Sequence, residues 1–320
     1  MTRFLLPALL LLAAGVPSAA AKTVLRVGYF PNITHAQGVI GAHGTREGRG
    51  WFEQRLGPDV EIQWFAFNAG PSAMEAIFAG SLDLTYVGPN PALNAYIRSK
   101  GAEVRLLAGA AEGGAALVVR GDAGITTAAD FKGRRVATPQ LGNTQDVAAR
   151  AYFKAQGFRL TPTGGEVLVV PTANPDQLTL FQARRIDAAW TVEPWVTRLV
   201  QEAGGRILLE QRDTLTTMLA SSVRFLREKP ELAERFRTAH AELTAWLNAH
   251  PDEAKTLVRA ALSAEVRREV PAALVEEAWG RLVFTSELRT DQLAGLVRDA
   301  QSVGYLRDAI PLDRLVSGKP

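Results

Sequence analysis

The sequence predicts an α/β protein of two similar lobes, each a mostly parallel sheet flanked by helices, with a ligand cleft between the lobes. Three observations support this prediction. Apolar segments typical of strands alternate with helical segments along most of the chain, a pattern that favours parallel sheets. One helix–turn–strand segment occurs twice, 104 residues apart. After Ser222 the pattern changes to helices alone.

The repeated segment covers residues 69–91 and, 104 positions later, residues 173–194. In each copy a proline and a small polar residue open a short amphipathic helix, and an apolar strand with an X-Pro exit follows. Asp83 and Asp187 are equivalent and are interpreted as the structural start of each strand. One unit built twice predicts two lobes with a cleft between them, and chance similarity is the alternative.

The elements of the first half follow in order. The apolar run 24–29 predicts a strand that leads into a helix at 31–36. Residues 60–65 alternate between apolar and polar side chains, which is typical of a half-buried strand, and the first repeat follows. Two more apolar runs, 104–108 and 115–119, predict two further strands.

The pattern then starts again. A helical turn is predicted at 127–131, and a polar turn at 142–146 opens a helix that runs through Phe153 and ends before Gly157. The second repeat continues this series. The remaining predicted strands are 135–138, 167–170, 207–209 and 217–220.

Four helices with apolar residues at helical spacing complete the chain, at 231–247, 252–262, 271–282 and 290–303. We assign residues 22–112 plus 226–320 to lobe 1 and residues 113–225 to lobe 2. Two crossings between the lobes, near 112 and 225, are expected to form the hinge.

Residues 1–21 are predicted to be a cleavable signal peptide. Arg3 precedes a short apolar run, and Ala19–Ala21 fits a cleavage site before Lys22. The chain has no cysteine, so no disulfide, thiolate metal site or lipid-modified cysteine is expected. These features favour a periplasmic protein that is exported and not lipidated.

The formal net charge is +3 and the charges are mixed along the chain, which argues against nucleic acid as a partner. The four histidines show no HExxH-type spacing, so we expect no metal site and no cofactor. No GxSxG, P-loop or dinucleotide-binding glycine motif is present, and no nucleophile–base–acid set is visible. An enzyme is therefore not expected.

Helix starts at the carboxyl ends of strands predict where a ligand binds. Unpaired N–H groups and a partial positive charge of about half a unit let a helix start hold an anion without Arg or Lys. Small polar residues at the predicted helix starts are therefore candidate ligand donors, although simple capping also explains residues such as Ser72. The candidates are Asn32, Thr34, His35, Ser72, Asn90, Asn143 and Thr144.

Two residues after the second repeat strand complete the candidate site. Trp190 is placed to cover the organic part of a ligand, with core packing as the alternative. Glu193 fits a ligand that carries an amine, a latch between the lobes, or a surface carboxylate. The differences between the two copies of the repeat are the best sequence indication of what is bound.

The chain resembles the periplasmic solute-binding proteins of the nitrate, sulfonate and taurine class of ABC importers. The motifs that carry the resemblance are VGYFPNITHA, GPSAMEAIFAGSLDLTYVGPNPALNAY, DFKGRRVATPQLGNTQD and DAAWTVEPW, and together they span essentially the whole mature chain. The PNITHA and GNTQD segments are most similar to aliphatic-sulfonate binders. The resemblance implies a type II periplasmic binding fold with a hinge that closes on the ligand.

This resemblance implies capture of a small oxyanion, most closely an aliphatic sulfonate, and its delivery to an ABC permease in the inner membrane by a monomeric protein. Nitrate, taurine, another small anion or a heterocycle is the alternative ligand, with a sensor role as the alternative function. An enzyme similar to thiamine-pyrimidine synthases is a further alternative, but those enzymes use a cysteine-rich motif that this chain lacks.

Overall fold

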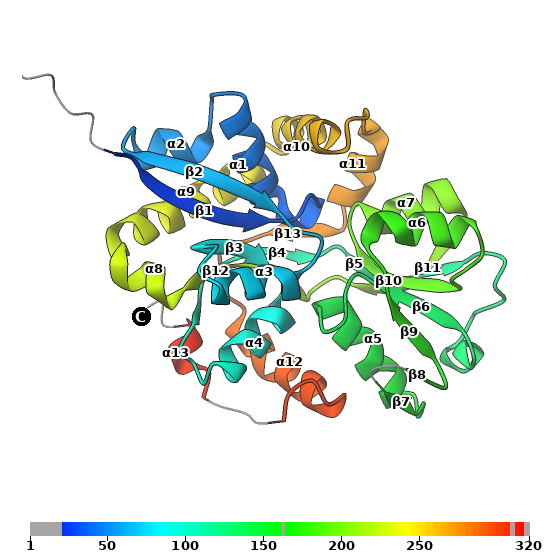
Figure 1. Cartoon of the computed structure of the whole chain (residues 1–320). Coiled ribbons are helices and arrows are strands. Elements are labelled where there is room, and N and C mark those ends of the chain that lie inside the picture. The colour runs from blue at the N-terminus through cyan, green and yellow to red at the C-terminus, as the bar shows by residue number, and fades with distance from the viewer. Residues whose placement is uncertain (1–20, 162–163, 308–310, 317–320) are drawn as a thin grey trace, which may run out of the picture.

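The computed structural model describes residues 21–161, 164–307 and 311–316, and the predicted signal peptide lies almost wholly outside these residues. The described chain forms two lobes (Figure 1). The first and last parts of the chain build lobe 1 around a six-stranded sheet, and the middle part builds lobe 2 around a five-stranded sheet. None of the described helices has the length and apolar character needed to cross a membrane.

The sheet of lobe 1 is mixed. Strands β1, β2 and β3 are parallel, whereas β12 runs antiparallel to β3 and β4. The edge strand β13 is antiparallel to β4. In spatial order the strands are β13 (Leu282–Phe284), β4 (Val104–Gly113), β12 (Leu215–Ser222), β3 (Leu84–Val87), β1 (Thr23–Tyr29) and β2 (Val60–Ala66).

The sheet of lobe 2 is also mixed. Strands β10, β6 and β9 are parallel, and β5 runs antiparallel to both of its neighbours. In spatial order the strands are β11 (Gly205–Gln211), β5 (Ala115–Arg120), β10 (Ala188–Val192), β6 (Arg135–Thr138) and β9 (Leu168–Pro171). A separate hairpin of β7 (Leu160–Thr161) and β8 (Gly164–Gly165) lies beyond the sheet.

In each sheet the first strand after a crossing runs opposite to the parallel strands, and in lobe 1 the edge strand β13 runs in this opposite direction as well. β5 follows the first crossing and β12 follows the second. The predicted α/β fold of sheets flanked by helices is confirmed, and the crossings explain why the sheets are mixed.

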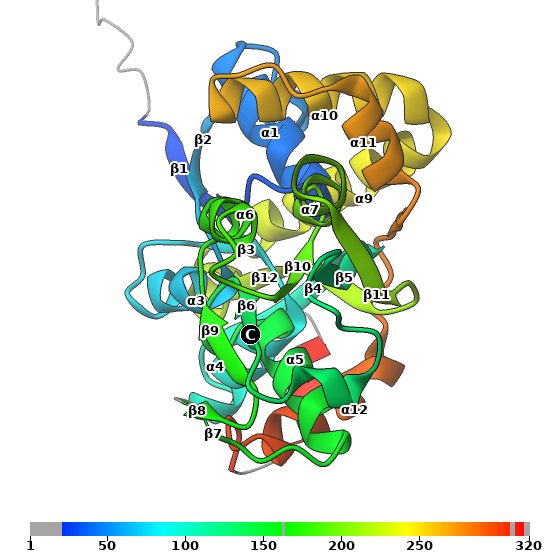
Figure 2. The same cartoon turned by 90° about the vertical axis from the view of Figure 1, so that its right-hand side faces the viewer.

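Helices cover both faces of both sheets (Figures 1 and 2). On one face of the lobe 1 sheet lie η1 (Ile33–His35), α1 (Ala36–Arg46), α2 (Trp51–Leu56), α8 (Val223–Glu228), α9 (Pro230–Ala249), α10 (Pro251–Val266) and α11 (Ala272–Trp279). On its other face lie α3 (Gly70–Phe78), α4 (Pro89–Arg98), α12 (Thr290–Ser302) and α13 (Asp313–Val316). Lobe 2 carries η2 (Ala128–Phe131) and α5 (Thr144–Ala155) on one face, and α6 (Asn174–Gln182) and α7 (Trp195–Ala203) on the other.

The two copies of the repeat occupy equivalent places in the two lobes. The first copy forms α3 and β3, and the second forms α6 and β10. β3 pairs in parallel with β1, and β10 pairs in parallel with β6. Asp83 Oδ2 accepts a hydrogen bond from the Arg26 backbone N–H at 2.9 Å, and Asp187 Oδ2 accepts one from the Arg135 N–H at 2.9 Å. Both aspartates therefore hold strand starts, as the sequence predicted.

The first crossing lies at Gly113 and Gly114, between β4 and β5. Both glycines have positive φ, +74° and +68°. A Cβ on Gly113 would lie 2.4 Å from the Arg281 carbonyl oxygen, so only glycine fits this turn.

The second crossing differs from the position near 225 that we expected. β12 already pairs with β3 and β4 in the lobe 1 sheet, so the chain returns between Gln211 and Leu215. The expectation followed the change in composition after Ser222. That change marks the start of the C-terminal helices and has no relation to the crossing.

Candidate functional site

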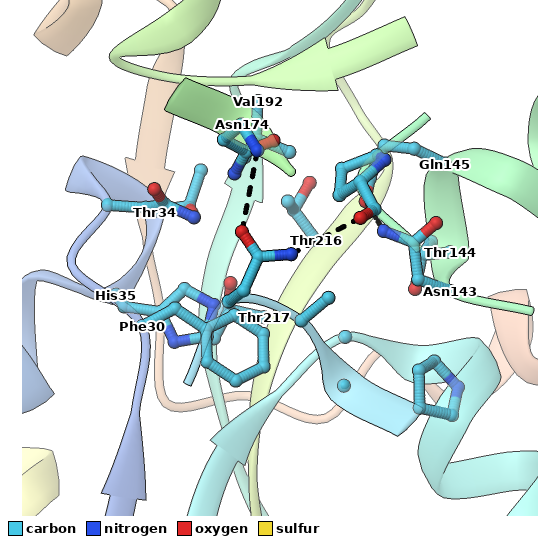
Figure 3. Close-up of a pocket in the computed structure, with 17 residues that line it drawn as sticks. Phe30, Thr34, His35, Asn143, Thr144, Gln145, Asn174, Val192, Thr216 and Thr217 are labelled. Atoms are coloured by element: carbon cyan, nitrogen blue, oxygen red, sulfur yellow. Dashed lines mark hydrogen bonds between the residues drawn. The ribbon is translucent and has the colours of Figure 1, made fainter. Parts of the chain in front are cut away.

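A pocket lies between the two lobes, where the starts of helices from both lobes meet (Figure 3). The space free of protein atoms is about 350 Å³, counted out to its open mouth. Residues of lobe 1, lobe 2 and the start of β12 all line it.

The lobe 1 wall is the turn that joins β1 to α1. The rings of Phe30 and His35 are stacked there, with centroids 4.2 Å apart (Figure 3). Thr34 Oγ1 is buried and has no hydrogen-bond partner among the described residues. Asn32 Oδ1 accepts a hydrogen bond from Trp195 Nε1 of lobe 2 at 2.9 Å. The turn thus offers a hydroxyl to the pocket and connects the two lobes.

His35 contributes a neutral ring to this wall. Burial lowers the pKa of its imidazole from 6.5 to about 3. Its Nδ1 is buried and has no partner among the residues that the structure describes. A neutral imidazole carries one N–H donor and one acceptor nitrogen, so His35 offers a hydrogen-bonding group and no positive charge.

The lobe 2 wall is built around the start of α5. Asn143 caps this helix, because its Oδ1 accepts a hydrogen bond from the Asp146 backbone N–H at 2.8 Å. Asp146 is fully buried, pairs with Arg150 at 3.1 Å and accepts a hydrogen bond from the Gly142 N–H. These contacts fix the helix start, so that Thr144 and Gln145 line the pocket.

Two threonines at the start of β12 lie between the walls (Figure 3). Thr216 Oγ1 donates a hydrogen bond to the Gly113 carbonyl oxygen at 2.6 Å, which ties β12 to the first crossing. Thr217 Oγ1 is buried and has no partner within the described part of the chain. Thr217 is therefore a second hydroxyl available to a ligand.

The pocket is electrically neutral in its side chains but not in its backbone. No lining residue is Asp, Glu, Lys or Arg, and His35 is uncharged at neutral pH. The starts of α3, α4, α5 and α6 contribute lining residues: Gly70, Gly88, Asn143 and Asn174. Helix starts carry a partial positive charge and N–H donors, so this arrangement suits an oxyanion held by neutral groups.

The structure brings part of the predicted site together. Five predicted residues line the pocket, and they are Asn32, Thr34, His35, Asn143 and Thr144. Asn90 lies next to the lining: its backbone N–H donates to Thr144 Oγ1 at 3.3 Å, and its side chain reaches the Leu296 carbonyl oxygen. Ser72 is exposed and exchanges a hydrogen bond with Gln140 of lobe 2, with Gln140 Nε2 at 3.0 Å from Ser72 Oγ.

Trp190 does not line the pocket, so this structure gives no support to its predicted ligand contact. The ring is buried in the core of lobe 2, where it packs edge-on against Tyr152 with centroids 5.7 Å apart. Its Nε1 donates to Gln211 Oε1 at 2.9 Å. The alternative that the sequence left open, core packing, describes this residue.

Glu193 also lies away from the pocket and joins the lobes. Its Oε1 is 3.1 Å from Arg281 Nη1 of lobe 1, and its Oε2 accepts the Thr197 backbone N–H at 3.1 Å. Its own carbonyl oxygen accepts the Ile33 N–H of lobe 1. Of the three sequence interpretations, the latch between lobes fits these contacts, whereas an amine of a ligand has no access to this carboxylate.

Several lining residues were not predicted, among them Phe30, Asn68, Gln145, Asn174 and Thr217. Gln145 and Asn174 stand at predicted helix starts, so they would be found if every polar residue of those turns were taken as a candidate. Asn68 and Thr217 have no local signal, because they reach the pocket through loop and crossing geometry. Within the described chain no group of three or more His, Asp or Glu residues is arranged as a metal site.

Two mixed α/β lobes, two crossings and a small pocket at the seam define a protein with the fold of periplasmic binding proteins. The alkanesulfonate-binding protein SsuA from Xanthomonas axonopodis pv. citri, bound to MOPS, matches with a TM-score of 0.72 at 21% identity, over 93% of this chain and 97% of that chain. The nitrate-binding protein NrtA from Synechocystis PCC 6803 matches with a TM-score of 0.71 at 15% identity, over 93% and 92%. At these identities the likeness shows the fold.

A profile of the NMT1-like family matches residues 18–263, and the chain belongs to this family. The taurine-binding periplasmic protein of Escherichia coli (strain K12) is 27% identical over 253 residues, which are 75% of this chain and 74% of that protein. The resemblance to binding proteins of the nitrate, sulfonate and taurine class is thus confirmed.

Proposed function

We propose that this protein is the periplasmic solute-binding component of an ABC importer and captures a small oxyanion, most closely an aliphatic sulfonate, between its lobes. The observation that carries the proposal is the chemistry of the pocket. Its lining is uncharged, four helix starts contribute to it, and the hydroxyls of Thr34 and Thr217 are buried without partners in the described chain. An oxyanion satisfies these donors without a counter-charge.

The cleft supports capture by closure of the lobes. Side chains from lobe 1 already meet lobe 2 on the hinge side through Asn32–Trp195 and Arg281–Glu193. A ligand that touches both walls adds contacts that exist only when the lobes are together. Such differential contacts shift the population toward the closed form, which then docks on a permease in the inner membrane.

The lining also favours some anions over others. Taurine carries an ammonium group, and that group meets no carboxylate in this pocket, since the oxygens of Glu193 are paired with Thr197 and Arg281. Sulfonates without an amine, and nitrate, bring no ammonium group that would need a carboxylate. We therefore place simple alkanesulfonates and nitrate ahead of taurine.

The remaining parts of the proposal follow from the sequence. Export through a cleavable signal peptide and the absence of cysteine give a free, non-lipidated protein in the periplasm. It acts as a monomer that binds its solute without chemical turnover. Its partners are the small anionic solute and the permease, and nucleic acid is not among them.

A thermal-shift panel tests the proposal. It compares methanesulfonate, ethanesulfonate, nitrate, taurine, bicarbonate and sulfate with uncharged dimethyl sulfone and a pyrimidine. A ligand at about 100 times its dissociation constant adds about 2.7 kcal/mol to the free energy of unfolding, which gives a visible shift. We expect alkanesulfonates or nitrate to shift the melting point most and taurine less. Shifts by uncharged compounds alone would contradict the proposal.

A further inference from the structure

A group of residues closes the mouth of the pocket. We call it the mouth bridge, and it consists of Asn68 and Ser72 from lobe 1 with Pro139, Gln140 and Asn174 from lobe 2. Asn68 lies in the loop between β2 and α3, exposed to solvent on one side and lining the pocket on the other. The bridge is separate from the contacts of Asn32 and Glu193 near the crossings.

The amide of Asn68 uses both of its ends across the cleft. Nδ2 donates to the Pro139 carbonyl oxygen at 3.2 Å, and Oδ1 accepts from the Asn174 backbone N–H at 3.4 Å. A dashed line in Figure 3 marks the bond that reaches Asn174. Only a carboxamide offers a donor and an acceptor in this geometry, because a carboxylate lacks the donor and an aliphatic side chain lacks both.

These two bonds join one loop of lobe 1 to two separate segments of lobe 2. Pro139 follows β6, and Asn174 begins α6. The bonds form only when the lobes are together, and Asn68, which makes both, is exposed to solvent and also lines the pocket. Asn68 is thus positioned where a bound solute enters and leaves.

Ser72 provides a comparison within the same bridge. It also bonds to lobe 2, through Gln140, but it does not line the pocket. Loss of the Ser72 hydroxyl removes a contact between lobes and leaves the space around a ligand unchanged. Loss of the Asn68 side chain removes contacts between lobes and also opens the pocket.

We propose that Asn68 is the gate residue of this pocket: its amide closes the mouth over a bound solute and limits how long the organic part of that solute is. The inference rests on the proposed function, since it takes the solute to be an oxyanion held deeper in the pocket. A solute that ends below Asn68 is enclosed. A longer solute holds Asn68 away from Pro139 and Asn174 and forgoes both bonds.

The exposed position of Asn68 suits a gate. Hydrogen bonds near solvent add little net stability, so the gate opens and closes readily. Substitutions at an exposed loop residue usually leave the fold intact. Thermal unfolding without ligand therefore serves as the check that Asn68→Ala, Asn68→Leu and Ser72→Ala are folded.

The experiment measures affinity by calorimetry and dissociation rate by stopped-flow fluorescence, for methanesulfonate and 1-butanesulfonate. We expect Asn68→Ala to raise the methanesulfonate dissociation rate about tenfold and to shift the affinity ratio about tenfold toward butanesulfonate. Asn68→Leu keeps the bulk but loses both bonds, so it should raise the rate and shift the ratio by less than Asn68→Ala does. Ser72→Ala should weaken both ligands by the same small factor.

Equal effects of Asn68→Ala and Ser72→Ala on both ligands would overturn the gate, because Asn68 would then be an ordinary contact between lobes. An unchanged ratio of methanesulfonate affinity to butanesulfonate affinity between wild type and Asn68→Ala would also overturn the gate. If the wild-type protein binds neither sulfonate nor any other oxyanion, the proposed function fails and the gate falls with it. A failure of the gate alone leaves wild-type binding in place.

Discussion

Thr34 in η1 and Thr217 near the start of β12 both line the pocket, and both Oγ1 atoms are buried without a partner among the described residues. An unpaired buried hydroxyl destabilises the folded protein by the cost of its lost hydration. Such a cost at two positions of one pocket is explained when a ligand supplies the partner. The two threonines are therefore the residues that most directly link the structure to binding.

The first prediction concerns Thr34→Val and Thr217→Val, which keep the shape and remove the hydroxyl. A hydrogen bond to a charged group is worth about 1.5–3 kcal/mol, so each change should weaken oxyanion affinity by about tenfold or more. The unfolding midpoint without ligand should stay level or rise. Calorimetric titration and thermal unfolding measure the two effects.

Thr244→Val is the matched control, since Thr244 Oγ1 is buried and donates to the His240 carbonyl oxygen in the core of lobe 1. It should lower stability and leave affinity unchanged. If Thr34→Val and Thr217→Val instead behave like Thr244→Val, the hydroxyls have a structural role only.

The second prediction concerns pH. Burial raises the pKa of Glu193 from 4.5 to about 7, although hydrogen bonds from Thr197 and the charge of Arg281 oppose the rise. The folded protein therefore retains a proton between pH 4.5 and 7 that the unfolded chain gives up. The stability from this group is fully present below pH 4.5 and is lost as pH rises through 7. As pH rises through 7, the free energy of unfolding of Glu193→Gln should therefore increase relative to that of wild type, by at most about 1.4 kcal/mol per pH unit.

Denaturant unfolding of both proteins between pH 5 and 8 measures this difference. Glu277→Gln is the control, because hydrogen bonding to Arg281 lowers the pKa of Glu277 below its usual value. The stability from Glu277 is lost only as pH falls below about 4.5, so that variant should show a constant difference from wild type. A constant difference for Glu193→Gln as well would mean that Glu193 is ionised throughout.

At the residue scale, most of the polar candidates at helix starts line the pocket, whereas Trp190 and Glu193 do not. Thr34, His35 and Asn143 directly follow strands or open helices, so their place at the cleft follows from topology. Trp190 stands in β10, whose residues are all buried. A strand buried on both faces gives no alternation that tells which side chain faces the cleft.

At the scale of elements, a helix start can both cap its helix and line the pocket. Asn143 caps α5 through its Oδ1 and also lines the pocket. Asp146 and Arg150 hold the same helix start in place from the interior of lobe 2. Capping and binding are therefore combined in one residue, and substitutions can separate them.

The third prediction separates these roles by comparing Asn143→Asp with Asn143→Ala. Aspartate keeps the cap but brings a negative charge into a neutral pocket, whereas alanine loses the cap at a cost of about 1 kcal/mol and keeps the pocket neutral. We expect the aspartate variant to be the more stable and the alanine variant to bind an oxyanion more tightly. Thermal unfolding and calorimetry measure the two rankings. If one variant has both the higher stability and the higher oxyanion affinity, the two roles of Asn143 are not separated and the prediction is wrong.

Most elements were predictable, including the short strand at 135–138, which is β6, and the turn at 127–131, which contains η2, whereas α2 and β13 were not predicted. The helices at 231–247 and 252–262 correspond to α9 and α10, and the strand at 60–65 corresponds to β2. The predicted helix at 271–282 ends at Trp279, because β13 begins at Leu282 and pairs with β4. Six-residue α2 and three-residue β13 are too short for a period to appear and are formed by tertiary packing.

At the scale of the whole molecule, the repeat and the two crossings determine the cleft. Equivalent helix–strand units face each other, and both supply residues to one pocket, such as Gly70 from the first and Asn174 from the second. The sequence therefore predicted two lobes and a cleft. The second crossing was not predictable from composition, because β12 has an ordinary strand pattern and only its pairing places it in lobe 1.

The central claim is that this pocket, whose side chains are neutral, recognises both the negative charge and the shape of a small oxyanion. Calorimetric titration of the wild-type protein with methanesulfonate and with dimethyl sulfone, at pH 7 in one buffer, tests it most directly, because the two solutes have nearly the same shape and differ in charge. We predict one binding site for methanesulfonate and an affinity for dimethyl sulfone at least a hundredfold lower. Equal affinities, or binding of dimethyl sulfone alone, would contradict the account.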